Sequence, residues 1–366
     1  MIALVLATVV RLVPMQEPVV FPLESMGKPE QIETALRIYR LDLGDLSRYP
    51  KVPYPSKAGT PGFGYPSRIE PYAVDDELAA KLAEYPGLEA YWFCRERLLA
   101  KPEKSSYTES SRDIASLRPY SDSIPFLLFR PKGNVWLCPW TFGRKIPLVI
   151  YMPGSGEQGT DLKLQFRQTA CLKKVTSAAF QEKHPCWFLI PMPPMNANWN
   201  IPQGYPTEPR MPLITLYNDL VLKVIELSER SAAPTIDRSR LYVTGLGSGG
   251  TMSAVMAFDH PGRYAAVMPV WSFPHVQPVV HPLAPGAWWY GWQATVWEKK
   301  AVGVEVIRRR LNRFAADVRQ FGGDFVIRTY PEGRAAYTWW NAVWESDVLW
   351  DWCFAKRSKG EVEVVE

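Results

Sequence analysis

The sequence is poor in the residues that most often build metal and redox sites. It has four histidines and five cysteines in 366 residues, and no two cysteines form a CxxC pair. His275 and His281 stand six residues apart in a proline-rich segment, which is not the spacing of a zinc site. We therefore expect no metal and no cofactor. An odd number of scattered cysteines indicates buried thiols rather than a disulfide framework.

Long hydrophobic runs and a strong excess of one charge are also lacking. The apolar run Ile2–Val10 is shorter than the ~20 residues that cross a bilayer, so no transmembrane span is expected. Arg11 follows this run and no A-x-A cleavage site is present. A signal peptide in residues 1–14 would mean export, and its absence a cytoplasmic protein. The net charge of +5 is too small to indicate nucleic-acid binding.

Prolines and tryptophans, in contrast, are abundant, with 34 and 15 residues. The first third of the chain combines helical patterns with proline-rich connectors. Helices are expected over Pro29–Leu43, after an N-cap at Asp75, and over about 88–100. We therefore predict an N-terminal extension, helical and rich in loops, over residues 1–120.

After residue 120 short apolar runs alternate with amphipathic helices. This alternation predicts one α/β domain over residues 121–356, a mostly parallel doubly wound sheet with helices on both faces. Residues 357–366 form a charged C-terminal tail. The expected strands are Pro125–Phe129, Pro147–Tyr151, Trp187–Ile190, Leu241–Thr244, Ala265–Val270 and Phe325–Thr329, and the clearest helices lie over 213–227 and 307–321.

The most informative segment is Leu241–Phe258, where a strand runs into a glycine cluster and then a helix. Gly245, Gly247 and Gly250 match the G-x-G-x-x-G pattern of dinucleotide sites. Such sites need an acidic residue at the end of the next strand, and Val270-Trp271-Ser272 has none. The second interpretation is a nucleophile elbow, in which small residues flank a strained strand-to-helix turn.

The second interpretation is supported by a family resemblance. Residues 237–250, DRSRLYVTGLGSGG, resemble the elbow of esterase- and depolymerase-like α/β-hydrolases, which include feruloyl and acetyl esterases and prolyl-oligopeptidase-type enzymes. Residues 146–161, IPLVIYMPGSGEQGTD, resemble the oxyanion loop of that family, and residues 184–194 resemble a further strand. The segment from Gly322-Gly323 to Trp340 resembles the region of the catalytic histidine. The resemblance implies an α/β-hydrolase fold over about residues 121–352.

The same resemblance implies that the catalytic side chains are absent. The nucleophile position is Gly247, the histidine position falls near Tyr337, and the acid position falls near Gly303. The oxyanion loop carries Pro153 where the family has histidine. Because a serine hydroxyl needs a neighbouring base, the loss of all three groups would abolish acyl-enzyme chemistry at this position.

Three functional hypotheses remain open, and one of them is a structural role, such as assembly through the tryptophan-rich face. A relocated catalytic site would use Ser248 as nucleophile, with His275 or His281 as base, in a serine esterase or peptidase. A degenerate hydrolase would instead bind a ligand through backbone N–H groups at Gly154, Ser155 and Ser248 without turnover.

Tryptophans indicate what such a pocket could bind. We expect Trp288, Trp289 and Trp292 on a loop at the carboxyl edge of the sheet, where their rings would suit a sugar or phenolic group. The tryptophans of residues 339–352 are expected in the core. The favoured function is a degenerate α/β-hydrolase that binds a carbohydrate-like or ester ligand, or a protein partner; the oligomeric state is left open.

Overall fold

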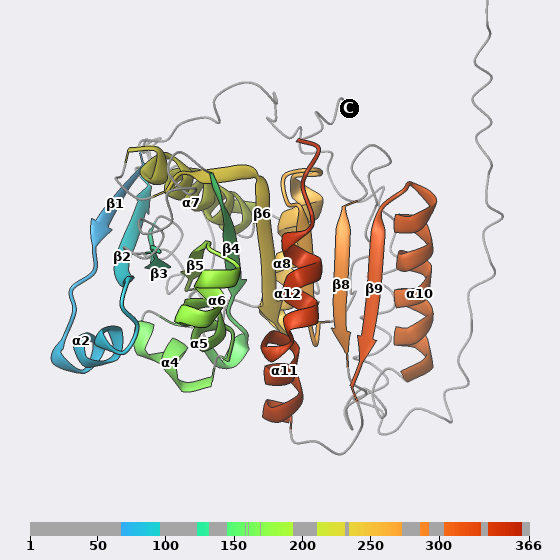
Figure 1. Cartoon of the computed structure of the whole chain (residues 1–366), viewed down its shortest axis with the longest axis horizontal. Helices are drawn as coiled ribbons and strands as arrows, with labels where there is room; N and C mark the ends of the chain where they lie inside the picture. Colours follow the sequence, from blue (N-terminus) through green and yellow to red (C-terminus); the bar gives the residue numbers. More distant parts are fainter. Residues whose placement is uncertain are drawn as a thin grey trace, which may run out of the picture.

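The computed structural model describes residues 67–95, 123–131, 145–157, 159, 161–168, 170–192, 211–230, 234–272, 286–292, 304–330 and 336–360. In these residues nine strands form one sheet with the order β1-β2-β3-β5-β4-β6-β7-β8-β9 (Figure 1). The strands are β1 (Ser67–Pro71), β2 (Leu88–Arg95), β3 (Ser123–Phe129), β4 (Ile146–Met152), β5 (Trp187–Pro191), β6 (Ile236–Leu246), β7 (Ala266–Val270), β8 (Ala287–Trp292) and β9 (Asp324–Thr329).

The type of strand pairing changes once across the sheet. β1, β2, β3 and β5 pair antiparallel, whereas β5, β4, β6, β7, β8 and β9 follow one another in parallel. β4 lies between β5 and β6, and every residue of β4 is buried. Such continuous burial requires cover on both faces, as parallel sheets have.

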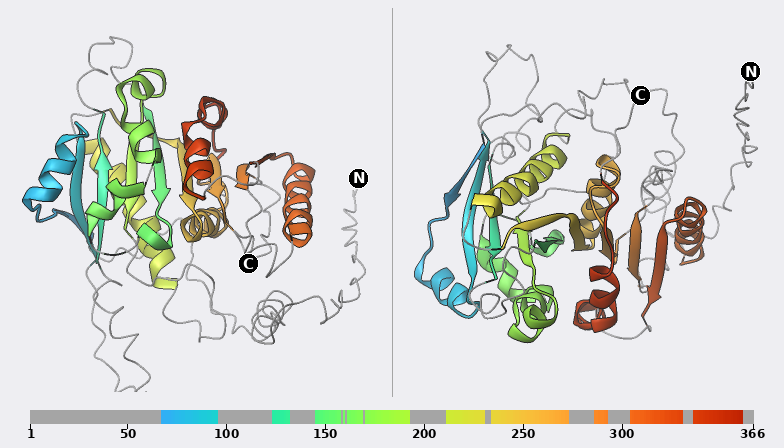
Figure 2. Two further views of the ribbon diagram at one scale, coloured as in Figure 1. Left: turned by 90° about the horizontal axis from the view of Figure 1, so that it is seen from below. Right: turned by 45° about the horizontal axis from the view of Figure 1, so that its top comes forward.

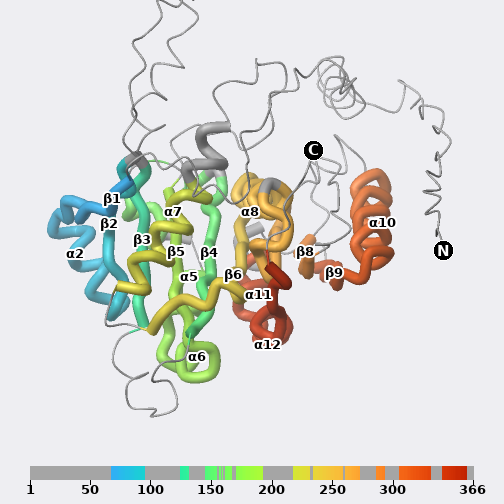
Figure 3. The backbone as a smooth tube through the Cα atoms, turned by 90° about the horizontal axis from the view of Figure 1, so that it is seen from above, coloured from blue at the N-terminus to red at the C-terminus, as the bar shows by residue number. Residues whose placement is uncertain are grey.

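Helices supply that cover. They are α2 (Asp76–Ala83), α4 (Gln165–Gln168), α5 (Ala170–Thr176), α6 (Ala178–Lys183), α7 (Met211–Arg230), α8 (Ser248–Asp259), α10 (Val304–Gln320), α11 (Ala336–Glu345) and α12 (Asp347–Phe354), with short 3-10 turns η5 (Ser155–Glu157) and η6 (Leu162–Leu164). One core cluster joins the sheet to α7, α8 and α10; the other joins it to α2, α5, α6, α11 and α12. Figure 3 shows α8 and α10 on the side of the sheet opposite α6 and α12. Among the described residues, none of these helices has the length and apolarity needed to cross a bilayer.

The predicted doubly wound sheet is confirmed. All six expected strands are present as β3, β4, β5, β6, β7 and β9, and the two clearest helices are α7 and α10. Asp75 is the N-cap of α2, where its carboxylate accepts a hydrogen bond from the backbone N–H of Leu78 at 2.8 Å. Figure 2 shows α2 and α10 at opposite ends of the sheet.

The helix expected over about 88–100 is wrong. Residues 88–95 form β2, which pairs with β1 on one side and β3 on the other. Its sequence, LEAYWFCR, is rich in aromatic residues that favour strands, and Phe93 is fully buried. The sheet therefore begins at Ser67, before the boundary expected at residue 120. The helix expected over Pro29–Leu43 lies outside the described residues.

The tryptophan loop expected after β7 is also corrected, because the segment forms strand β8. Trp288, Trp289 and Trp292 are only 4, 6 and 4% exposed. Trp288 packs on Phe314 from one face, and Trp289 packs on Trp352 from the other. These three rings are therefore core side chains of the sheet. The core position expected for the tryptophans of residues 339–352 is confirmed for three of them, Trp340, Trp344 and Trp350.

Candidate functional site

The turn between β6 and α8 has the strained backbone of a nucleophile elbow. Gly247 is the single residue between Leu246, which ends β6, and Ser248, which begins α8. Its φ of 54° and ψ of −114° lie in a region that glycine adopts most readily. The Gly247 N–H donates to the carbonyl of Val270 at 2.8 Å, which ties the turn to the end of β7. The apex of the turn is therefore Gly247.

Two further glycines make the sharp turn sterically feasible. A Cβ on Gly249 would lie 1.9 Å from the carbonyl oxygen of Met152, and a Cβ on Gly245 would lie 2.5 Å from the backbone of Gly249. Neither position accepts a side chain without a shift of the backbone. The tight positions are thus two residues before and two after Gly247. Leu246, in contrast, carries a large buried side chain, so the turn is not centred on Ser248.

The loop after β4 meets this turn. A Cβ on Gly154 would lie 3.0 Å from the carbonyl oxygen of Leu246, so the two segments are in contact. Ser155 begins η5 at the same junction. The first N–H groups of α8 have no intrahelical partner and carry partial positive charge. The segments predicted to form the oxyanion pocket therefore lie side by side.

A buried carboxylate holds the loop after β4. Glu157 is 2% exposed, and its Oε2 accepts hydrogen bonds from the Tyr151 hydroxyl and the Gly154 N–H, both at 2.9 Å. The Glu157 carbonyl accepts from the Gln165 side chain at 3.1 Å. Because the Gly154 N–H already has a partner, it is not available to a ligand, although the sequence suggested it as a donor.

An indole ring stands beside the apex of the turn. A Cβ on Gly247 would lie 3.8 Å from Cε3 of Trp271, which is an ordinary van der Waals contact, so position 247 has space for a Cβ atom. Trp271 follows β7 with a φ of 48°, is partly exposed, and packs against Trp340 as a tilted ring pair with centroids 5.5 Å apart. Its Nε1 has no hydrogen-bond partner among the described residues.

Three other nucleophilic side chains, Cys171, Cys186 and Ser272, are buried. Burial raises the pKa of the Cys171 thiol well above its usual value, and the nearby charge of Glu157 raises it further. Burial raises the pKa of Cys186 to about 12, although a hydrogen bond from Gln181 opposes the shift. Since the thiolate is the reactive form, neither cysteine is suited to attack an ester. The Ser272 hydroxyl is 4% exposed and pairs with the Tyr290 hydroxyl at 2.7 Å.

The remaining predicted site residues are placed as follows. Ser248 is the half-buried first residue of α8. Tyr337 lies in α11, but its side chain is not among the described ones, and His275, His281 and Gly303 lie outside the described residues.

Glu305, the carboxylate nearest in sequence to the expected acid position, belongs to an exposed ion-pair network. It lies in the first turn of α10 and binds Arg308 at 3.0 Å, with more than half of each side chain exposed. It is therefore a surface group.

Sequence reasoning missed the roles of Glu157 and Trp271. Glu157 lies in the segment that resembles the oxyanion loop. Its role as the buried carboxylate that holds this loop could therefore have been inferred from its place in the sequence. The position of Trp271 over Gly247 depends on β6 and β7 pairing in register, which the sequence does not reveal.

The strand order and the elbow together are those of an α/β-hydrolase fold, as the sequence predicted. No protein-family model matches the chain, and no curated protein matches it. Its structure is similar to a thermostable esterase at 22% identity and a TM-score of 0.45, over 64% of this chain; the chain spans 60% of that esterase. It is also similar to an S-formylglutathione hydrolase from Staphylococcus aureus, at 11% identity and a TM-score of 0.40, over 64% of this chain and 91% of the other. A siderophore hydrolase from Aspergillus nidulans is a third similar structure, at 10% identity and a TM-score of 0.43, over 75% of this chain and 96% of the other.

Proposed function

We propose that the chain is a degenerate α/β-hydrolase that binds an ester of a sugar or of an aromatic acid at the elbow and does not hydrolyse it. The observation that carries the proposal is Gly247. It keeps the strained backbone of the nucleophile position and has space for a Cβ atom, yet carries no hydroxyl. Without that hydroxyl no acyl-enzyme forms at the apex of the turn.

The chemistry around Gly247 favours a ligand with a carbonyl group beside a flat face. The N-terminal end of α8 offers partial positive charge, which suits a carbonyl oxygen. The partly exposed ring of Trp271, supported by Trp340, suits the apolar face of a sugar or an aromatic ring. An ester of either kind combines the two groups.

The competing proposal is an active serine esterase or peptidase that uses Ser248 with His275 or His281. In its favour, Ser248 is half-buried rather than buried and lies next to the turn. Against it, the strained φ and the tight glycine positions are centred on residue 247, so Ser248 has the backbone of a first helical residue.

The proposal is tested by measuring ligand binding with and without the indole. An acetylated oligosaccharide and an aromatic methyl ester are titrated into the protein by calorimetry, and their hydrolysis is followed by chromatography. We expect at least one of them to bind without turnover, and Trp271→Ala to weaken that binding at least fivefold.

The control variant is Trp92→Ala, because Trp92 is also a partly exposed tryptophan, stacked on Tyr72 at 5.4 Å, and lies on β2 away from the elbow. It should leave the affinity unchanged. The proposal would be refuted if either compound were hydrolysed or if neither compound bound. It would also be refuted if Trp271→Ala bound the ligand with the same affinity as the unaltered chain.

A further inference from the structure

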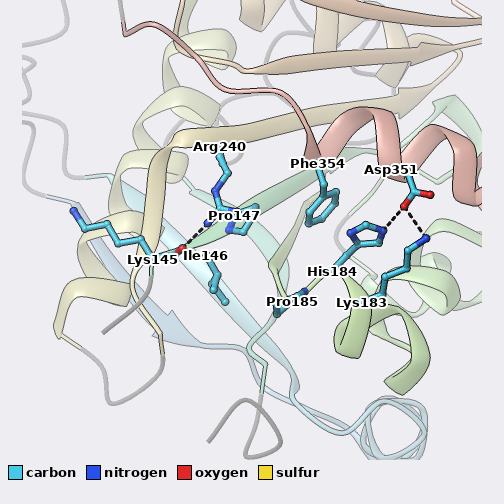
Figure 4. Close-up of a pocket in the computed structure, with 9 residues that line it drawn as sticks. All are labelled: Lys145, Ile146, Pro147, Lys183, His184, Pro185, Arg240, Asp351 and Phe354. Atoms are coloured by element: carbon cyan, nitrogen blue, oxygen red, sulfur yellow. Dashed lines mark hydrogen bonds and ion pairs between the residues drawn. The ribbon is translucent and has the colours of Figure 1, made fainter. Parts of the chain in front are cut away.

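A pocket of about 420 Å³ lies at the opposite edge of the sheet from the elbow. Ile146 begins β4, and Pro185 lies two residues before β5, so the pocket faces the amino ends of two parallel strands. The elbow follows the carboxyl ends of such strands. The residues that line the pocket are Lys145, Ile146, Pro147, Lys183, His184, Pro185, Arg240, Asp351 and Phe354 (Figure 4).

The pocket carries an excess of positive charge. Lys145, Lys183 and Arg240 stand against one carboxylate, Asp351. That carboxylate is already engaged, because it binds Lys183 Nζ at 2.7 Å and His184 Nε2 at 2.9 Å. Burial lowers the pKa of His184, although its hydrogen bond to Asp351 opposes the shift. The histidine therefore adds no full charge near neutral pH.

Arg240 keeps donors for a ligand. Its Nε donates to Asp237 at 2.8 Å, and one Nη2 hydrogen binds the carbonyl oxygen of Lys145 at 2.5 Å. Asp237 is shared with Arg357 at 3.1 Å, so a second cation offsets part of its charge. The Nη1 group of Arg240 and the ammonium of Lys145 have no partner among the described residues. A guanidinium with free donors suits a phosphate or a carboxylate.

The rest of the pocket is apolar and partly aromatic. The Phe354 ring is half-buried and packs against His184 as a tilted ring pair with centroids 4.6 Å apart. Pro147 and Pro185 complete the apolar wall. Figure 4 shows Lys145 and Arg240 on one side of the pocket and His184, Lys183 and Asp351 on the other, with Phe354 between them.

We propose that this pocket binds a small organic anion in which a phosphate or carboxylate is attached to a flat ring. The anionic group binds at Arg240 within the field of Lys145 and Lys183, and the ring packs on Phe354 and the prolines. The site is separate from the elbow and does not depend on the function proposed there.

The test is calorimetric titration of the full chain at low salt with three probes: phenyl phosphate, benzoate and inorganic phosphate. The informative variant is Lys145→Gln/Lys183→Gln, which removes the formal charge excess through two exposed side chains. We expect it to weaken binding of phenyl phosphate at least tenfold. Binding of benzoate but not phenyl phosphate would assign the site to carboxylates, and the reverse to phosphates.

The matched control is Lys173→Gln/Lys81→Gln, which makes the same charge change outside the pocket. Lys173 is exposed, like Lys145, and Lys81 is ion-paired with Glu84 at 3.0 Å, as Lys183 is with Asp351. This variant should bind phenyl phosphate within twofold of the unaltered chain. An equal loss in both double variants would mean unspecific attraction, and no binding of any probe at millimolar concentration would also overturn the proposal.

The ring contact is tested separately by Phe354→Leu, with its melting temperature checked because Phe354 also packs on Phe180 and Tyr242. We expect weaker binding of phenyl phosphate and unchanged binding of inorganic phosphate. Equal binding of phenyl phosphate by this folded variant would remove the ring from the proposal.

Discussion

Three glycines in five residues set the geometry of the turn between β6 and α8. Gly245 and Gly249 let the first turn of α8 approach the carbonyl of Met152, while Gly247 takes the strained φ. The glycine pattern was visible in the sequence because the motif is local. The neighbouring Trp271 was not visible because its contact with Gly247 depends on the register of β6 and β7, whereas the hydrogen-bond partners of Glu157 all lie within eight residues of it.

Adding one methyl group to Gly249 should therefore strongly destabilise the fold. The new Cβ would lie 1.9 Å from a backbone oxygen, so Gly249→Ala is expected to lower the free energy of unfolding by at least about 3 kcal/mol. Gly156→Ala is the control, since a Cβ there meets nothing within 4 Å, and should cost less than about 0.5 kcal/mol. Urea denaturation measures both. Equal costs would mean that the close approach at Gly249 does not exist.

Asp237 and Arg240, which stand in the segment that resembles the hydrolase elbow, form an ion pair at 2.8 Å. Burial raises the pKa of Asp237, but hydrogen bonds from Ser239 and Arg240 outweigh it and bring the pKa to about 2. The usual value of 3.8 applies to the unfolded chain. The stabilisation is therefore complete above about pH 4 and is lost as the pH falls towards 2.

Asp237→Asn should accordingly destabilise the chain by about 1–2 kcal/mol at pH 7, through the loss of charge-assisted hydrogen bonds. The difference from the unaltered chain should shrink as the pH falls from about 4 to about 2. Asp317→Asn on α10 is the control, because the structure gives it no ion pair among the described residues. A difference that is independent of pH would contradict the assigned role.

At the scale of elements, the uniformly apolar strands were predictable and the aromatic ones were not. β4, β5 and β7 are runs of buried aliphatic and aromatic residues between turn signals, and the sequence indicated them correctly. β2 and β8 are dense in tryptophan, tyrosine and phenylalanine, a composition shared by amphipathic helices and ligand-binding loops. Only pairing with their neighbours decides that they are strands.

The start of α2 depends on one side chain. Asp75 accepts the N–H of Leu78 and also binds Lys163 at 3.1 Å. Asp75→Ala should cost about 1 kcal/mol of unfolding free energy, whereas Asp75→Ser should retain most of the stability because serine also caps helices. Asp76→Ala, in the same exposed turn, should lower the free energy of unfolding by only about a few tenths of a kcal/mol. If Asp75→Ser is as unstable as Asp75→Ala, the ion pair rather than the cap stabilises this end of α2.

At the scale of the whole molecule, the segment before the expected boundary is part of the sheet. Phe93 of β2 is fully buried in the same core cluster as α7 and α8. Phe93→Ala should therefore lower the stability of the main unfolding transition by about 3–5 kcal/mol.

Val74→Ala is the matched control, since Val74 is 44% exposed in the same segment and should cost little. Chemical denaturation followed by tryptophan fluorescence measures both variants. If Phe93→Ala left the main transition unchanged, residues 67–95 would be an independent extension, as the sequence first indicated.

We propose that the chain retains the hydrolase elbow without its nucleophile. The most direct measurement is the intact mass of the protein after incubation with a fluorophosphonate, for the unaltered chain and for Ser248→Ala. We expect no adduct on either protein. An adduct on the unaltered chain that disappears in Ser248→Ala would contradict the proposal and establish a relocated serine nucleophile.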